Sequence, residues 1–168
     1  PLLGTAGITR VVNGPIPYAP DGLPLIGQMP GVPNAFEACV FTFGIVQAGG
    51  AGKLLADIMV DGESETDSWA VDPRRFTDHV DHAYATAKAI ETYSHEYAMH
   101  FPQIQWPAGR GAKTSPLYDK LAAAGAAFGS YGGWERADWF PRDGEQALPA
   151  NSYDRQHWFD TVGAECRH

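Results

Sequence analysis

The chain has 168 residues, and its hydrophobic content of 44% is normal for a globular chain of one domain or parts of two. Twenty acidic side chains against twelve basic ones give a net charge of −8, which argues against nucleic acid as the main partner. No apolar run approaches the roughly 18 residues of a membrane-spanning helix, so we expect no membrane partner.

The first third of the chain predicts short strands followed by a helix. We expect strands at Val11 and Val12, over residues 24–28 and over residues 36–41, with a turn-rich segment between the first two. After the third strand the apolar residues fall at helical spacing. A strand that leads directly into a helix places the helix N-terminus at the strand's carboxyl end, where α/β proteins bind ligands.

The predicted helix opens at Gly44, is rich in glycine, and should end at Gly62. Gly49, Gly50 and Gly52 each cost about 1 kcal/mol relative to alanine inside a helix. We therefore infer that something requires a bare backbone there. A helix N-terminus with small side chains suits a ligand that carries negative charge or carbonyl oxygens.

Two phosphate-binding motifs resemble this glycine run, and both are excluded. A P-loop needs a glycine five residues before Gly52 and a serine or threonine after the lysine, but these positions hold Gln47 and Leu54. A dinucleotide fingerprint that begins at Gly50 needs a third glycine where Leu55 stands. The chain therefore has no motif for the nucleotide end of a cofactor.

A second helix is predicted over residues 84–99, after the composition becomes charged and aromatic. Its apolar stripe consists of Ala83, Ala87, Ile90 and Tyr97. His79 and His82, with aspartates beside them, have the chemistry to bind zinc or iron. The same spacing is equally typical of a solvated acidic surface, and we predict no metal site.

The last third of the chain begins with a predicted extended connection over residues 101–113. A helix should follow, capped by Thr114 or Ser115 and with Pro116 in its first turn. Residues 132–136 and 139–140 are rich in aromatic side chains, which fit a binding surface or, as we favour, a contact between parts of a larger protein. Glu135 and Arg136 could form a buried pair that fixes this contact.

Several motifs follow the order and separations found in one family of flavoproteins. They are Val12-Asn13-Gly14-Pro15, Pro20-Asp21-Gly22, Pro24-Leu25-Ile26-Gly27, the run from Gly44 to Lys53, Asp72-Pro73-Arg74-Arg75-Phe76, Thr114-Ser115-Pro116-Leu117-Tyr118, Gly133-Trp134-Glu135-Arg136, Trp139-Phe140, Trp158-Phe159 and Val162-Gly163-Ala164-Glu165. Over essentially its whole length the chain thus resembles the dimethylglycine dehydrogenase and sarcosine dehydrogenase family, within the D-amino-acid-oxidase superfamily.

The resemblance implies a chain of the α+β or α/β class in three parts. Residues 1–66 would be the end of an FAD-dependent oxidoreductase domain, with strands and then the glycine-rich helix. Residues 67–122 would be the small, mostly helical central domain, and residues 123–168 the beginning of an aminomethyltransferase-like folate domain. The family's nucleotide-binding segment comes earlier, so we expect an internal fragment whose partner is the remainder of the parent polypeptide.

The resemblance also places the turn that opens the glycine-rich helix beside the pyrimidine edge of the flavin. The cofactor-binding residues that it implies are Leu23, Pro24, Leu25, Phe43, Gly44, Ile45 and Val46. A helix N-terminus stabilises an anion by about 0.3–1 kcal/mol when exposed and up to about 2 kcal/mol when partly buried, which suits reduced flavin. FAD is the implied cofactor, and tetrahydrofolate is a candidate for the full-length protein. No catalytic residue is assigned.

The function that the resemblance implies is oxidation of the CH–NH group of an N-methylated glycine, such as dimethylglycine or sarcosine, in the bacterial cytoplasm or the mitochondrial matrix. Related oxidases anchor the substrate carboxylate where this chain has Ile16 and Val46, so we expect the anchor outside the chain. One alternative is a non-enzymatic homologue similar to the pyruvate dehydrogenase phosphatase regulatory subunit. Another is an isolated interaction module.

Overall fold

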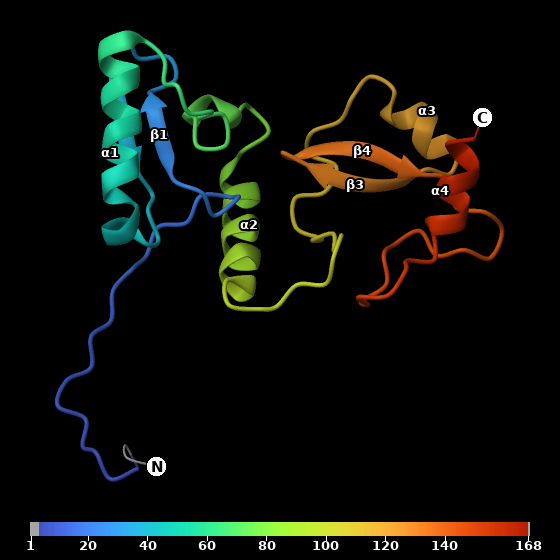
Figure 1. The fold of residues 1–168 in the computed structure, drawn as a ribbon, viewed down its shortest axis with the longest axis horizontal. Coiled ribbons are helices and arrows are strands. Elements are labelled where there is room, and N and C mark those ends of the chain that lie inside the picture. The colour runs from blue at the N-terminus through green and yellow to red at the C-terminus, as the bar shows by residue number, and fades with distance from the viewer. Residues whose placement is uncertain (1–3, 168) are drawn as a thin grey trace.

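The computed structural model describes residues 4–167 and has a mixed α and β fold (Figure 1). Its elements, in chain order, are β1 (Leu25–Gln28), β2 (Phe36–Cys39), α1 (Gly44–Asp61), the 3-10 helix η1 (Pro73–Arg75), α2 (His82–His95), α3 (Tyr118–Ala123), β3 (Ala127–Tyr131), β4 (Trp134–Trp139) and α4 (Phe159–Glu165). Figure 1 shows β1 and α1 at one end of the long axis, α2 in the middle, and the β3–β4 hairpin with α3 and α4 at the other end.

The first sheet is the antiparallel pair β1–β2, against which α1 packs. Ile26 of β1 and Ala51 of α1 are buried there. The α1 helix ends as predicted, at Gly62, whose left-handed φ of 84° lets its N–H bond to the carbonyl oxygen of Ile58 at 3.2 Å. The expectation of strands followed by a glycine-rich helix is therefore confirmed for β1, β2 and α1.

Two strand predictions in this region need correction. Val11 and Val12 lie in irregular backbone and are exposed, because among the described residues no other strand pairs with them. The third predicted strand ends at Cys39 rather than residue 41. Val40 has a left-handed φ of 60°, which a continuing β ladder cannot accommodate.

The second helix, α2, begins at His82 because the Asp81 carboxylate accepts the Tyr84 N–H at 2.7 Å. The prediction that the apolar stripe forms the buried face of this helix was wrong, since Ile90 is 66% exposed and Tyr97 is 85% exposed. The helix instead buries Glu91 and Thr92. Local periodicity failed here because α2 packs against turns that offer polar backbone groups rather than against an apolar layer.

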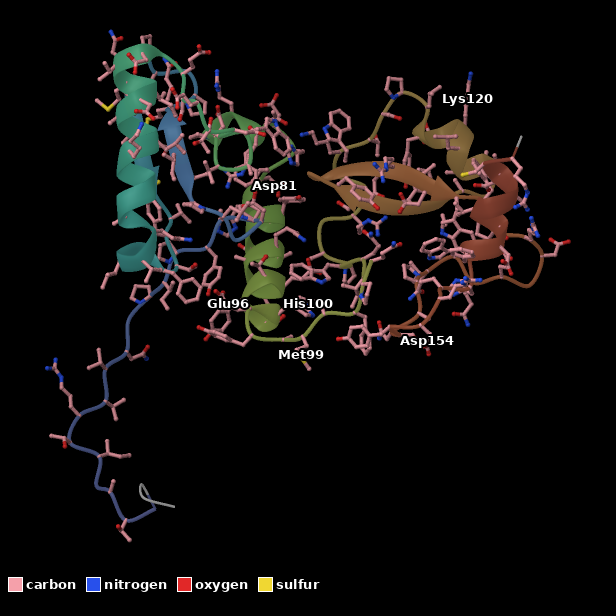
Figure 2. The ribbon with its side chains drawn as sticks, viewed as in Figure 1. Asp81, Glu96, Met99, His100, Lys120 and Asp154 are labelled. Atoms are coloured by element: carbon pink, nitrogen blue, oxygen red, sulfur yellow. The ribbon has the colours of Figure 1, made fainter. Side chains whose placement is uncertain are left out.

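These buried polar contacts join α2 to the segment before β1. The Thr92 hydroxyl donates to the Pro20 carbonyl oxygen at 3.2 Å. The Tyr18 hydroxyl donates to the Glu96 carboxylate across 78 residues of sequence, and this hydrogen bond raises the pKa of Tyr18 to about 12. Figure 2 labels Glu96 at the end of α2. Tyr18 and Pro20, in the segment before β1, are thus held by α2 and the residue that follows it.

A further contact fixes α2 to the connection that follows it. One oxygen of the Glu91 carboxylate accepts the Ala108 N–H at 2.7 Å, and the other accepts the Lys88 ammonium at 2.5 Å. Residues 101–113 contain no helix or strand, as predicted. The helix expected after them is α3, but the predicted cap at Thr114 or Ser115 was wrong, and so was the place of Pro116 in the first turn. The helix begins at Tyr118 with Leu117 at its cap, and the Ser115 hydroxyl accepts the Leu117 N–H just before it.

The β3–β4 hairpin was not predicted from the sequence. Its two strands are antiparallel and turn at Gly132 and Gly133, which both have positive φ angles, as hairpin turns of two residues require. Trp139 of β4 is buried, and the Glu165 carboxylate of α4 accepts the Phe140 N–H at 3.0 Å. The aromatic residues of this region therefore form a sheet, with alternate side chains on its two faces.

Glu135 pairs with Arg110, so the pairing of Glu135 with Arg136 that the sequence suggested was wrong. The Arg110 guanidinium donates to both Glu135 oxygens, at 2.7 and 2.6 Å, and to the Phe128 carbonyl oxygen at 2.9 Å. Arg136 is the next residue of β4, and its guanidinium lies 3.7 Å from the centre of the Tyr131 ring. The Glu135 side chain is 3% exposed, so the Arg110–Glu135 pair is a buried link between the 101–113 connection and the β3–β4 hairpin.

Replacing Glu135 with glutamine should lower the free energy of unfolding of the 168-residue chain by about 3 kcal/mol, because it leaves a partly buried guanidinium without its counter-ion. The Arg110 hydrogen bonds hold the pKa of Glu135 below its ordinary value of 4.5. The carboxylate therefore stabilises the fold fully above pH 4.5, and its contribution disappears as the pH falls through the lower pKa of the folded state. Urea unfolding followed by circular dichroism measures both effects.

The matched control for this experiment is Glu65→Gln, because Glu65 is exposed. We expect that variant to stay within about 0.5 kcal/mol of the wild type. The difference in free energy of unfolding between the wild type and Glu135→Gln should become smaller below pH 4.5. Equal losses in the two variants, or a gap that does not depend on pH, would contradict the role given to this ion pair.

Candidate functional site

The seven residues predicted to bind the cofactor lie at one end of the β1–β2–α1 unit. The register pairs Leu25 with Cys39, so the start of β1 lies beside the end of β2, a few residues before α1 begins. In Figure 1, β1 and α1 begin at the same, lower end. Residues 23–25 and 43–46, which are separate in sequence, are therefore neighbours in the fold.

The exposure of these residues differs along the site. Pro24 is buried and Leu25 is half-buried, so they belong to the support of the sheet. Leu23 and Phe43 are nearly half exposed, whereas Ile45 is 96% exposed and Val46 is 82% exposed. The apolar side chains of the first turn of α1 thus form an open surface.

The backbone of this first turn is also open. Phe43 stands at the N-cap and makes no side-chain cap hydrogen bond, and the turn has no acidic residue. The first hydrogen bond along the helix runs from the Gln47 N–H to the Phe43 carbonyl oxygen at 3.2 Å. Among the described residues, the N–H groups of Gly44, Ile45 and Val46 have no acceptor, so they are available to a ligand.

Two further observations concern the same turn of α1. The side-chain oxygen of Gln47 is buried and has no hydrogen-bond donor among the described residues. A Cβ at Gly44 would be 3.4 Å from the Cβ of Phe41, whereas a Cβ at Gly49, Gly50 or Gly52 would meet nothing within 4 Å. The described residues therefore do not supply the close partner that we inferred for these three glycines.

Arg75 fixes the turn that leads into β1, a role that the sequence analysis did not predict. Its guanidinium donates to both Asp21 oxygens, at 2.7 and 3.0 Å, and to the Leu23 carbonyl oxygen at 2.9 Å. The Leu23 N–H donates in turn to the Asp21 carboxylate at 3.0 Å. With only 5% of its side chain exposed, Arg75 holds residues 21–23 in one conformation.

The position of Arg75 follows from η1. The Asp72 carboxylate accepts the Arg74 N–H at 2.8 Å and so caps this short helix, with Pro73 at its start. The Ile26 N–H donates to the Val71 carbonyl oxygen at 2.9 Å, which aligns this segment with β1. Fifty-four residues separate Asp21 from Arg75, so no local pattern could reveal the pair.

A cavity of about 640 Å³ lies between α2, the 101–113 connection and the tip of the β3–β4 hairpin. Leu23 and Arg75 form part of its wall, together with aromatic residues of the other segments. His79 also lines the cavity; burial lowers its pKa, and its Nδ1 lies 2.9 Å from the Thr77 hydroxyl. Residues 4–167 contain no group of three or more side chains arranged to hold a metal ion, and none of their helices could cross a membrane.

Comparison with known proteins confirms the resemblance to the dimethylglycine and sarcosine dehydrogenases. Residues 61–115 match the family described as the FAD dependent oxidoreductase central domain. Human mitochondrial dimethylglycine dehydrogenase is 39% identical over 166 residues, which cover 98% of this chain and 19% of the relative. A 4-methylaminobutanoate oxidase (formaldehyde-forming) of Paenarthrobacter nicotinovorans is 38% identical over 98% of this chain and 20% of its own length.

Two further relatives bear on the choice between enzyme and regulator. Mouse mitochondrial sarcosine dehydrogenase is 35% identical over 91% of this chain and 17% of its own length. The mouse mitochondrial pyruvate dehydrogenase phosphatase regulatory subunit is 31% identical over 99% of this chain and 20% of its own length. The chain therefore spans about a fifth of the length of the relatives it matches.

We expect Arg75→Ala to lower the free energy of unfolding by about 2–3 kcal/mol, because it removes the counter-ion of the Asp21 carboxylate and leaves the Leu23 carbonyl oxygen without its side-chain donor. The matched control is Arg74→Ala, since the Arg74 side chain is 70% exposed and, within residues 4–167, forms an ion pair only with Asp72. That change should cost less than about 1 kcal/mol. Equal stability of the two variants in urea unfolding would refute the role assigned to Arg75.

Proposed function

We propose that this chain is part of a longer FAD-dependent oxidoreductase that oxidises the CH–NH group of N-methylated amino acids, with dimethylglycine or sarcosine as substrate. The observation that carries this proposal is the 39% identity to a dimethylglycine dehydrogenase over 98% of the chain. The 4-methylaminobutanoate oxidase widens the set of candidate substrates. The proposed compartment is the bacterial cytoplasm or the mitochondrial matrix, and the names of the mammalian relatives include the word mitochondrial.

Within this protein the chain would contribute three parts. Residues 1–66 would end the flavin domain, residues 67–122 would form the central domain, and residues 123–168 would begin the aminomethyltransferase-like domain. The family match over residues 61–115 overlaps the middle part and supports a central domain there. Tetrahydrofolate is a candidate cofactor of the longer protein only.

The first turn of α1 fits the pyrimidine edge of the flavin in FAD. When bound, FAD would supply the hydride acceptor. In this proposal the N–H groups of Gly44, Ile45 and Val46 donate to the flavin carbonyl oxygen and ring nitrogen, and Leu23, Pro24, Leu25 and Phe43 complete that side of the site. The turn has no acidic residue, which suits the pyrimidine edge of a flavin because that edge becomes anionic on reduction. The unpaired Gln47 oxygen adds a buried acceptor that calls for a donor.

The remainder of the longer polypeptide is the proposed partner of the open side of α1. Gly49, Gly50 and Gly52 carry a helix-propensity cost of about 1 kcal/mol each, yet a Cβ at any of the three would meet no described residue within 4 Å. A partner that packs closely against bare backbone accounts for both facts. No catalytic residue is proposed within this chain, and Ile16 and Val46 offer no polar group to a substrate carboxylate.

The proposed activity is tested on the longer protein that contains this chain, purified with its bound flavin. Without oxygen, dimethylglycine, sarcosine or 4-methylaminobutanoate should bleach the visible absorbance of the flavin, whereas glycine should not. A protein that purifies without flavin and does not take up FAD would favour the regulatory homologue instead. Bound flavin that none of the three amines reduces would refute the proposed substrate class.

The assignment of the first turn of α1 to the flavin can be tested with a pair of glycine variants. Gly44→Val should lower flavin content or reduction potential in the longer protein, because a branched side chain would stand where the flavin edge meets the backbone. Gly50→Val in the same helix serves as the comparison, since it should disturb the proposed packing of the longer polypeptide and lower the free energy of unfolding without changing the reduction potential of the bound flavin. Full flavin content, potential and turnover in Gly44→Val would place the cofactor elsewhere.

A further inference from the structure

A second, smaller cavity of about 170 Å³ lies between the β3–β4 hairpin, α4 with its N-cap, and residues 103–105. All of its described lining residues fall between residues 103 and 162, whereas the predicted flavin-binding residues are 23–25 and 43–46. It therefore has no part in the proposed oxidation. A cavity of about 150 Å³ can take up a molecule of the size of benzene, so this one has room for a compact group of a few heavy atoms.

Two tryptophans from different elements form part of the cavity wall. They are Trp139 of β4, which is 4% exposed, and Trp158 at the N-cap of α4. A T-shaped contact with His157, with 5.6 Å between the ring centres, holds Trp139 in place. Among the described residues no cation lies over either indole, whereas Tyr131, which also lines the cavity, already carries the Arg136 guanidinium on its ring. The two indoles are therefore the rings that a ligand can meet, and indole attracts a cation more strongly than the other aromatic side chains.

Asp138 alone carries a charge among the described residues that line this cavity. Its ion pair with Arg136 is weak, because the Arg136 Nε lies 3.5 Å from Oδ1 and the Arg136 side chain is 62% exposed. The other oxygen, Oδ2, would clash with a Cβ at Gly129 and accepts no hydrogen bond from the described residues. The carboxylates of Glu91 and Glu135, in contrast, each accept at least two hydrogen bonds of 2.8 Å or less. Asp138 thus has unused capacity to pair with a cation.

The other polar groups of the wall distinguish between kinds of cation. The Gln105 side-chain oxygen already accepts the Ser130 N–H at 2.8 Å, which leaves Gln103 as the other amide of the lining. A primary ammonium has three N–H donors, and donors left unpaired against an apolar wall cost free energy. A methylated ammonium has the same charge with fewer N–H groups or none. The wall therefore favours a cation whose surface consists of methyl groups.

We propose that this cavity binds a small molecule that carries a methylated ammonium group, with its methyl groups against Trp139 and Trp158 and its positive charge facing Asp138. Attraction to two indoles and pairing with a carboxylate then act on the same group. The ligand belongs to a class related to the proposed substrates, but the site is formed without the first turn of α1. It does not depend on the proposed oxidation.

The test is calorimetry on the longer protein that contains this chain, with choline as the probe at constant ionic strength. One comparison compound is 3,3-dimethylbutan-1-ol, which has the shape of choline without its charge. The other is ethanolamine, which has the charge without the methyl groups. Each should bind at least about tenfold more weakly than choline. Absence of choline binding, or equal binding of either comparison compound, would refute the proposal.

Two variants locate the binding. Asp138→Asn keeps the shape of the side chain, so it should weaken choline binding by about tenfold or more and leave binding of the neutral alcohol within about threefold. Trp158→Leu keeps the wall apolar and should weaken choline binding about three- to tenfold. The matched control is Asp154→Asn, an exposed aspartate outside the lining that Figure 2 labels, and it should leave choline binding unchanged. Choline binding that survives either Asp138→Asn or Trp158→Leu unchanged would overturn the assignment.

Discussion

Three buried charged side chains connect segments of this chain that have little apolar core between them. Arg75 holds the turn before β1, Glu91 holds the connection after α2, and Glu135 holds the β3–β4 hairpin. The buried apolar side chains among the described residues are few: Ala19, Pro24, Ile26, Ala51, Pro73, Ala127 and Trp139. Since so little hydrophobic surface is removed from water, the geometry depends on hydrogen bonds whose loss would leave a charge or a peptide group unpaired.

This dependence explains which parts of the fold could be predicted from the sequence. The α1 helix has a helical apolar period and a terminal Gly62, so local pattern was sufficient. The apolar stripe of α2 misled because the side that packs is the polar one, with Glu91 and Thr92. The β3–β4 hairpin was missed because its glycines and aromatic residues suggested a contact surface, and their alternation along two strands was not recognised.

The candidate site likewise has one part that the sequence predicted and one part that it did not. Residues 23–25 and 43–46 were predicted as cofactor-binding through family order, and the register of β1 with β2 brings them to one end of the sheet. Arg75 and the cavity could not be found, because they depend on pairs and walls formed across more than fifty residues. A pattern within a window of ten or fifteen residues contains no information about such contacts. The Arg75 pair forms where η1 meets residues 21–23, and α2 forms one wall of the larger cavity.

The contacts between α2 and the segment before β1 also set an order for folding. Residues 25–61 contain both strands of the first sheet and α1, so they can fold from contacts close in sequence. Tyr18 and Pro20, in contrast, bind Glu96 and Thr92 across 78 and 72 residues. Closing such long loops is slow compared with forming a hairpin or a helix. During synthesis Tyr18 and Pro20 therefore cannot make these contacts until α2 and Glu96 have left the ribosome, although they belong to the first part of this stretch to be made.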